Sequence, residues 1–128
     1  FEIGVGQIVS PMIAVSNEYV WYPDTEPINN PWSTYGGEIT FSFTLSASST
    51  LSLEAEVINQ DIYHDSFWVW MNSDTSVAWH VSPNSASWHW AVYGSTFTLP
   101  AGTNVLHLGA RENTTKLRNI VLKKSGVI

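Results

Sequence analysis

The chain contains no cysteine, so disulfides, a thiol nucleophile and a thiolate metal site are all excluded. It is also poor in positive charge: its first 110 residues carry ten acids and no lysine or arginine, and the formal net charge is −6. All five basic residues lie in the last 18 positions. Nucleic acids and anionic membranes are bound by surfaces rich in Lys and Arg. We therefore expect no nucleic-acid partner and no membrane partner.

Long apolar runs are missing as well, since no window approaches the roughly 18 consecutive apolar residues of a membrane span. A 14.3 kDa chain with 44% hydrophobic residues is long enough for one core and too short for two. Residues 1–128 are therefore predicted to form a single domain. The chain begins at Phe1, without an initiator Met or a cleavable signal, which favours an excised or mature module. The absence of cysteine favours bacterial export over animal secretion.

Catalytic motifs are absent from the sequence: there is no zinc-hydrolase motif, nucleophile elbow or phosphate loop. The four histidines are scattered without ligand spacing. His64 and Asp65 could form half of a triad, but nothing marks a serine as the nucleophile. Glu54 and Glu56 share a strand face at a spacing that a glycosidase pair could use, although acids on an outer face are usually solvated. We expect a protein that is not an enzyme.

Apolar and polar residues alternate along most of the chain, which is typical of strands. Residues 39–45 and 51–57 each place four apolar side chains on one face, and the polar connection 46–50 is typical of a hairpin or a sandwich corner. Further strands are expected at residues 1–9, 19–22, 66–71, 77–81, 88–93, 96–99, 104–110 and 117–123. The predicted fold class is all-β, a β-sandwich or jelly roll of antiparallel strands.

All seven tryptophans lie between positions 21 and 90, and this is more indole than one small core requires. Within residues 66–71 we expect Phe67, Val69 and Met71 to face inward. Trp68 and Trp70 would then lie on the opposite face, either in solvent or under the proline-rich loop 23–37. Exposed flat rings favour flat apolar ligands, and pyranose sugars are such ligands.

Several segments in a fixed order resemble those of non-catalytic carbohydrate-binding modules. They are Ser-Pro-Met at 10–12, Tyr-Val-Trp at 19–21, Asp-Ser-Phe-Trp-Val-Trp at 65–70, Trp-His at 79–80, Trp-His-Trp at 88–90, and the segments 97–103, 108–117 and 120–122. The order is similar to galactose-binding-like β-sandwich modules, close to families 6 and 16, which are attached to secreted polysaccharide-degrading enzymes. The resemblance implies a secreted, extracellular protein with two partners, a polysaccharide or oligosaccharide ligand and the catalytic domain of a larger enzyme.

The resemblance also implies a cleft near one end of the sandwich, flanked by aromatic rings and by polar residues of a late loop. The residues carried over are Tyr19, Trp21, Trp79, Trp88, Trp90, Arg111, Glu112, Asn113 and Lys116. Tyr19 and Trp90 could equally be core residues, and Arg111 with Glu112 could equally be a surface ion pair. Two other functions stay open: a structural or adhesion β-sandwich whose aromatics form a protein interface, and a small glycan hydrolase or lyase.

Members of such families often hold a structural calcium through an early Glu and an Asp in the final strand. Glu2 fits the first position, but Arg118 stands where the acid is expected. An arginine cannot ligate calcium and would repel it. We therefore expect no metal site and no cofactor, with an Arg118–Glu2 pair as a metal-free substitute.

Overall fold

The computed structural model describes residues 7–9, 13–15, 19–21, 38–112 and 114–124, with side chains from residue 38 onward. These residues form ten strands and no helix. The strands are β1 (Gln7–Val9), β2 (Ile13–Val15), β3 (Tyr19–Trp21), β4 (Glu38–Leu45), β5 (Ser49–Asn59), β6 (Ser66–Met71), β7 (Val77–His80), β8 (Ser85–Leu99), β9 (Gly102–Ala110) and β10 (Lys116–Lys124). A helix long and apolar enough to cross a membrane does not occur in this part of the chain.

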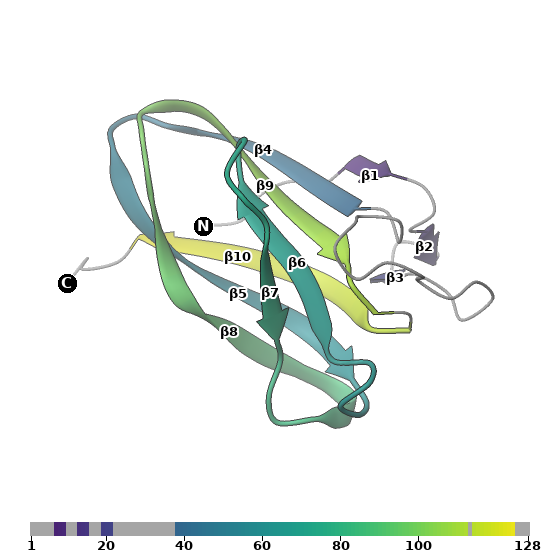
Figure 1. Ribbon diagram of the computed structural model, residues 1–128. Coiled ribbons are helices and arrows are strands. Elements are labelled where there is room, and N and C mark those ends of the chain that lie inside the picture. The colour runs from purple at the N-terminus through teal and green to yellow at the C-terminus, as the bar shows by residue number, and fades with distance from the viewer. Residues whose placement is uncertain (1–6, 10–12, 16–18, 22–37, 113, 125–128) are drawn as a thin grey trace.

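The strands form two five-stranded antiparallel sheets, which pack face to face (Figure 1). The first sheet has the order β1-β4-β9-β6-β7, and the second has the order β2-β3-β10-β5-β8. The predicted all-β sandwich of antiparallel strands is therefore confirmed. The starts of β6, β8 and β10 lie at one end of the sandwich, together with the ends of β5, β7 and β9.

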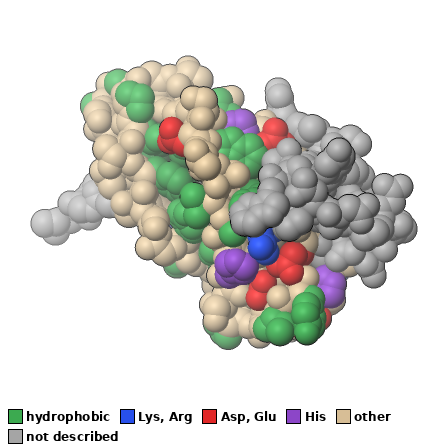
Figure 2. Space-filling view, in the orientation of Figure 1, with side chains coloured by type: hydrophobic (Ala, Val, Ile, Leu, Met, Phe, Trp, Pro, Cys, Tyr) green, Lys and Arg blue, Asp and Glu red, His purple; other side chains and the backbone are tan. Residues whose placement is uncertain are grey.

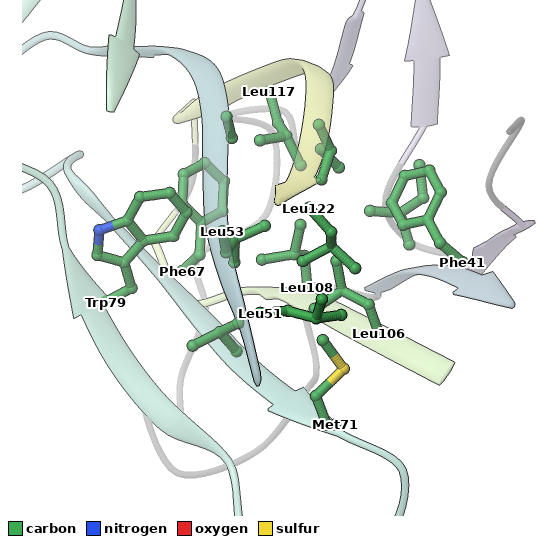
Figure 3. Packing of buried hydrophobic residues seen from close by; sticks show 14 of the residues in the cluster. Phe41, Leu51, Leu53, Phe67, Met71, Trp79, Leu106, Leu108, Leu117 and Leu122 are labelled. Atoms are coloured by element: carbon green, nitrogen blue, oxygen red, sulfur yellow. The ribbon is translucent and has the colours of Figure 1, made fainter. Parts of the chain in front are cut away.

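The core lies between the sheets because each strand presents one apolar face to the other sheet (Figure 3). Along β4 the inward set is 4–7% exposed, and along β5 it is completely buried. These two sets are the predicted ones: Ile39, Phe41, Phe43 and Leu45, and Leu51, Leu53, Ala55 and Val57. The period-two pattern predicted both faces because a pleated strand sends successive side chains to opposite sides.

The strand pairing decides two points about the predicted connections. β4 and β5 belong to different sheets, so residues 46–48 form the sandwich corner, one of the two predicted alternatives, and not the hairpin. The predicted strands at 88–93 and 96–99 are one strand, β8, which continues through Gly94. A bulge in β8 accommodates Gly94. Between the pairs Val92–Glu54 and Thr96–Ser52, β8 has three residues where β5 has one.

Candidate functional site

The structure distributes the predicted site residues over several places. Trp88 and Trp90 lie on β8 in the second sheet, whereas Arg111 and Glu112 follow the end of β9 in the first. Lys116 begins β10, where the backbone register pairs it with Trp21 of β3. The side chains of Tyr19 and Trp21, and the whole of Asn113, lie outside the described residues.

Trp79 is the predicted site residue that the structure contradicts. It pairs with Phe67 across β6 and β7, so both rings face the other sheet (Figure 3). Its side chain is 5% exposed, and its ring centroid lies 6.2 Å from that of Phe67 and 5.7 Å from that of Tyr93. With its ring packed in this way, Trp79 is a core residue.

The outer side of β8 carries two tryptophans, Trp88 and Trp90, followed by Val92, and these three residues form the aromatic face. Trp90 is 51% exposed and Val92 is 61% exposed, while Ala91 between them is buried in the core. The alternation therefore turns the tryptophans away from the core, and Trp90 is a surface residue rather than a core residue. β8 is also the last strand of its sheet. Exposed apolar groups that lie next to one another are typical of contact surfaces.

A clamp formed by Arg118 and Glu56 lies beside this face. The Nε and Nη2 atoms of Arg118 donate to the two carboxylate oxygens of Glu56 at 2.9 Å each. The Cζ atom of Arg118 lies 4.0 Å from the ring centroid of Trp88. Glu56 is the direct cross-strand neighbour of both Arg118 and Trp90. One carboxylate thus orders the guanidinium over Trp88 and lies next to the exposed ring of Trp90.

Asn119 completes the clamp and was not expected from the sequence. The register of β10 shifts between Arg118 and Ile120, and Asn119 takes a left-handed backbone conformation with a φ of 44°. Asn tolerates this region better than most residues, and here its Nδ2 donates to Glu56 Oε1 at 2.9 Å. An Asn inside an otherwise apolar-alternating strand is a signal for such a bulge.

Glu54 and Glu56 are engaged as ion-paired carboxylates. Lys123 Nζ lies 3.0 Å from Glu54 Oε1. Hydrogen bonds from Arg118 and then Asn119 hold the pKa of Glu56 below its usual value. A glycosidase acid needs a raised pKa, so these contacts oppose the reading of this pair as catalytic.

At the end of the sandwich, Arg111 and Glu112 join a polar network around the start of β6, and Figure 2 shows charged and histidine side chains gathered there. Arg111 Nη1 donates to Ser66 Oγ at 2.9 Å, and this hydroxyl contacts Glu112 Oε1. Behind it, the buried Asp65 accepts a hydrogen bond of 3.2 Å from Asn84 Nδ2. The guanidinium and carboxylate are thus bridged by a serine that sequence reasoning missed, and they are not a simple surface pair.

This polar end keeps hydrogen-bonding capacity that no described residue uses. Four of its buried polar atoms lack a hydrogen-bond partner among the described residues: Asp65 Oδ1, Arg111 Nε, Thr114 Oγ1 and Thr115 Oγ1. Thr114 also has a φ of 63°, a conformation that β-branched residues rarely adopt. Unsatisfied buried groups and backbone strain concentrate at functional sites.

The other tryptophan pair, Trp68 and Trp70, lies on the outer side of β6. As predicted, the residues that alternate with them, Phe67, Val69 and Met71, face the core and are each 1% exposed. Trp68 is 6% exposed, so the alternative that it points into solvent is wrong. Trp70 stacks on the imidazole of His107 with 4.6 Å between ring centroids. The loop at 23–37, predicted as a possible cover, lies outside the described residues.

His64 and Asp65 do not form half of a triad, in agreement with the expectation that this pair is not catalytic. His64 Nδ1 lies 2.7 Å from Asp61 Oδ1, and this contact is the main cause of a lowered pKa at Asp61. Asp65 instead contacts Asn84, with His80 Nδ1 3.9 Å from its other oxygen. His64 is therefore paired with an acid three residues earlier in its own loop.

The described residues contain no group of three or more His, Asp or Glu side chains that could hold a metal ion. Arg118, the residue that replaces the expected calcium ligand, directs two of its nitrogens to Glu56. Glu2 lies outside the described residues, so its pairing with Arg118 stays a prediction.

No protein-family model matches the chain, and no curated protein matches it in sequence. Among solved structures it is similar to exo-β-1,3-galactanase from Phanerochaete chrysosporium, in a complex with β-1,3-galactotriose. The identity is 18% and the TM-score 0.69, and the match covers 96% of this chain and 28% of the enzyme. The chain therefore spans little more than a quarter of that enzyme's length.

Two isolated modules match over nearly their whole length. A family 35 carbohydrate-binding module from an environmental isolate shares 19% identity at a TM-score of 0.63, covering 98% of this chain and 93% of that one. Xyl-CBM35, in complex with a disaccharide that contains glucuronic acid, shares 13% identity at a TM-score of 0.62, covering 96% and 91%. At these identities the likeness shows a shared fold. The expected neighbours were families 6 and 16, whereas these modules belong to family 35.

Proposed function

We propose that this chain is a non-catalytic carbohydrate-binding module that binds a polysaccharide or oligosaccharide on its aromatic face. The single observation that carries the proposal is the exposure of Trp90, at 51%, on a rigid strand. Neighbouring Trp88 is ordered by the Arg118–Glu56 clamp. A flat apolar ring flanked by fixed polar groups matches a pyranose, which has apolar C–H faces and a hydroxyl rim.

The energetics favour weak, reversible binding. Stacking a sugar on one indole removes about 100 Å² of apolar area from water, which is worth about 2 to 3 kcal/mol. Two rings with a few hydrogen bonds then give roughly micromolar to millimolar dissociation constants after the cost of association. Such affinities are useful when a second domain is tethered to the same polymer.

The arrangement in known enzymes supports a targeting role. The galactanase from Phanerochaete chrysosporium contains a region of this fold within a much longer chain. We infer that the present chain likewise holds a catalytic domain on its substrate, in a secreted protein acting outside the cell. Its own lack of catalysis is supported by the ion-paired state of Glu54 and Glu56 and by the pairing of His64 with Asp61.

Tryptophan fluorescence provides the test. The isolated domain is titrated with a panel of soluble mannans, xylans, galactans and uronic-acid polymers, and product release is assayed in parallel. We expect a saturable change in emission with at least one glycan and no new reducing ends. Flat titrations across the panel would point instead to a protein interface, and product release would show a hydrolase or lyase.

A further inference from the structure

A groove of about 460 Å³ separates β7 from β8 on the side where the sandwich is open. Figure 2 shows hydrophobic side chains along this hollow. β7 ends the first sheet and β8 ends the second, so the groove runs between two edge strands. Its volume lies in the range of small-ligand sites.

Val77 shows that the two sheets do not close over this edge. The register pairs Val77 with Val69 and Trp79 with Phe67, so Val77 belongs to the core-facing side of β7. Nevertheless it is 51% exposed, whereas Val69 is 1% exposed. A core-facing apolar side chain that stays half exposed marks a gap in the packing between the sheets.

The bulge in β8 forms the opposite wall. Between the pairs Val92–Glu54 and Thr96–Ser52, β8 has three residues where β5 has one, and Tyr93, Gly94 and Ser95 line the groove there. A Cβ atom added to Gly94 would meet nothing within 4 Å, so this wall is open. A bulge on an edge strand also hinders the pairing of another strand, which disfavours an extended peptide as the occupant.

Two aromatic residues, Trp79 and Tyr93, line the groove. The rings of Trp79 and Tyr93 meet edge to face at 5.7 Å, and Tyr93 stacks on Phe97 at 5.5 Å. Tyr93 is half-buried and packs against the core. Tyr93 and the edge of Trp79 therefore supply apolar surface, while the serines and the exposed His80 of the rim supply hydrogen-bonding groups.

Fixed charge is absent from the lining, which includes no Asp, Glu, Lys or Arg among the described residues. We propose that this groove is a second ligand site, adjoining the aromatic face at Val92, that takes an uncharged sugar ring. An apolar floor with a neutral polar rim suits a pyranose without a carboxylate or sulfate, because an anionic group would lose hydration without gaining a cationic partner. That the ligand is a sugar rests on the proposed function.

Amide NMR spectra of the ¹⁵N-labelled domain separate the two sites, since the Gly94 and Ser95 amides report the groove and the Trp90 indole N–H reports the aromatic face. The probes are mannohexaose and β-1,3-galactotriose, with trigalacturonic acid as the charged comparison. We expect the neutral probes to shift the Gly94 and Ser95 amides saturably. Trp90→Ala should leave the groove affinity within about twofold, because Trp90 does not line the groove.

Val77→Glu places a charge in the groove and should weaken the groove response by about tenfold or more. Val105→Glu on β9 is the matched control, because Val105 does not line the groove. This variant should leave the shifts of the groove amides unchanged. If Val77→Glu lowers the melting temperature, Ser95→Trp at an exposed position of the bulge serves as the second block.

The outcomes distinguish the two proposals. Shifts at the Trp90 indole alone would overturn the groove site and support the aromatic face as the ligand site. Shifts at Gly94 and Ser95 alone would overturn the aromatic face and support the groove. Equal groove shifts with trigalacturonic acid would contradict the preference for an uncharged ring. Shifts that depend on protein concentration without sugar would assign the groove to a second copy of the chain and overturn the proposal.

Discussion

Two strands carry the same sequence pattern, Trp-x-Trp, with opposite results. On β6, Trp68 is 6% exposed and Trp70 stacks on His107. On β8, Trp90 is 51% exposed on the outer face. Both pairs lie on the outer side of their sheet, so alternation alone does not distinguish them.

Position within the sheet distinguishes the two pairs. β6 lies between β9 and β7, whereas β8 is an edge strand with β5 as its one partner. Neighbours on both sides of β6 supply contacts such as His107 from β9, which stacks on Trp70. On the outer face of the edge strand β8, Trp90 has a neighbouring strand on one side and keeps half of its surface in solvent. The β6 pair is therefore held by packing, whereas on β8 the exposed ring is that of Trp90.

The largest expected effect is on folding. Trp68→Ala should lower the free energy of unfolding by about 3 to 5 kcal/mol, because it deletes a large side chain that is almost completely buried. Trp90→Ala should lower it by about 1 kcal/mol or less, since half of that side chain already meets solvent. Urea denaturation followed by circular dichroism measures both, and equal losses would contradict the difference between the strands.

A smaller loss of stability is expected at the clamp. Arg118→Gln removes the bidentate pair with Glu56 and the guanidinium from the face of Trp88, and should cost about 1 kcal/mol, because solvent screens a pair that is partly exposed. Lys124→Gln removes the same charge from an exposed position of the same strand and is the matched control. The melting temperatures of the two variants give the comparison, and equal values would show that the clamp does not order this face.

Sequence reasoning predicted what depends on local pattern. The inward faces of β4 and β5 follow from alternation, and so does the split of residues 66–71 into an inward and an outward set. It could not predict facts that depend on strand pairing. Trp79 was assigned to the site through the family resemblance, but its register with Phe67 places its ring in the core.

Contacts between distant parts of the chain were equally hidden. Glu56 and Arg118 are 62 positions apart in the sequence, and either could have paired elsewhere. The bulge in β8 was missed because Gly94 is typical of a turn, and here the strand continues through it. The sequence therefore predicted that the candidate site consists of aromatic rings with polar neighbours. The clamp and the serine bridge at Ser66 could not be predicted, because they depend on how the strands pack.

The pH dependence of stability should change at Glu56. Its pKa is lower in the folded chain than its usual value of 4.5, so its contribution is present above that value and is lost as the pH falls through the folded pKa. Stability of the wild type should therefore fall more steeply than that of Glu56→Gln between about pH 5 and pH 3. Urea midpoints at several pH values test this, and parallel curves would contradict it.

The smallest expected effect is that of metal removal. Since Arg118 binds Glu56 in place of the expected acidic ligand, a chelator should leave the melting temperature unchanged. A fall of several degrees with EDTA, reversed by added calcium, would show a site completed by residues outside the described part of the chain.

The most direct measurement of the central claim is calorimetric titration of Trp90→Ala beside the wild type, with a glycan selected by the fluorescence panel. We predict that affinity falls by about tenfold or more, equivalent to about 1.4 kcal/mol, because the lost stacking surface belongs to the complex. The melting temperature should stay close to that of the wild type. Unchanged affinity in a folded Trp90→Ala variant would contradict the assignment of β8 as the glycan-binding strand.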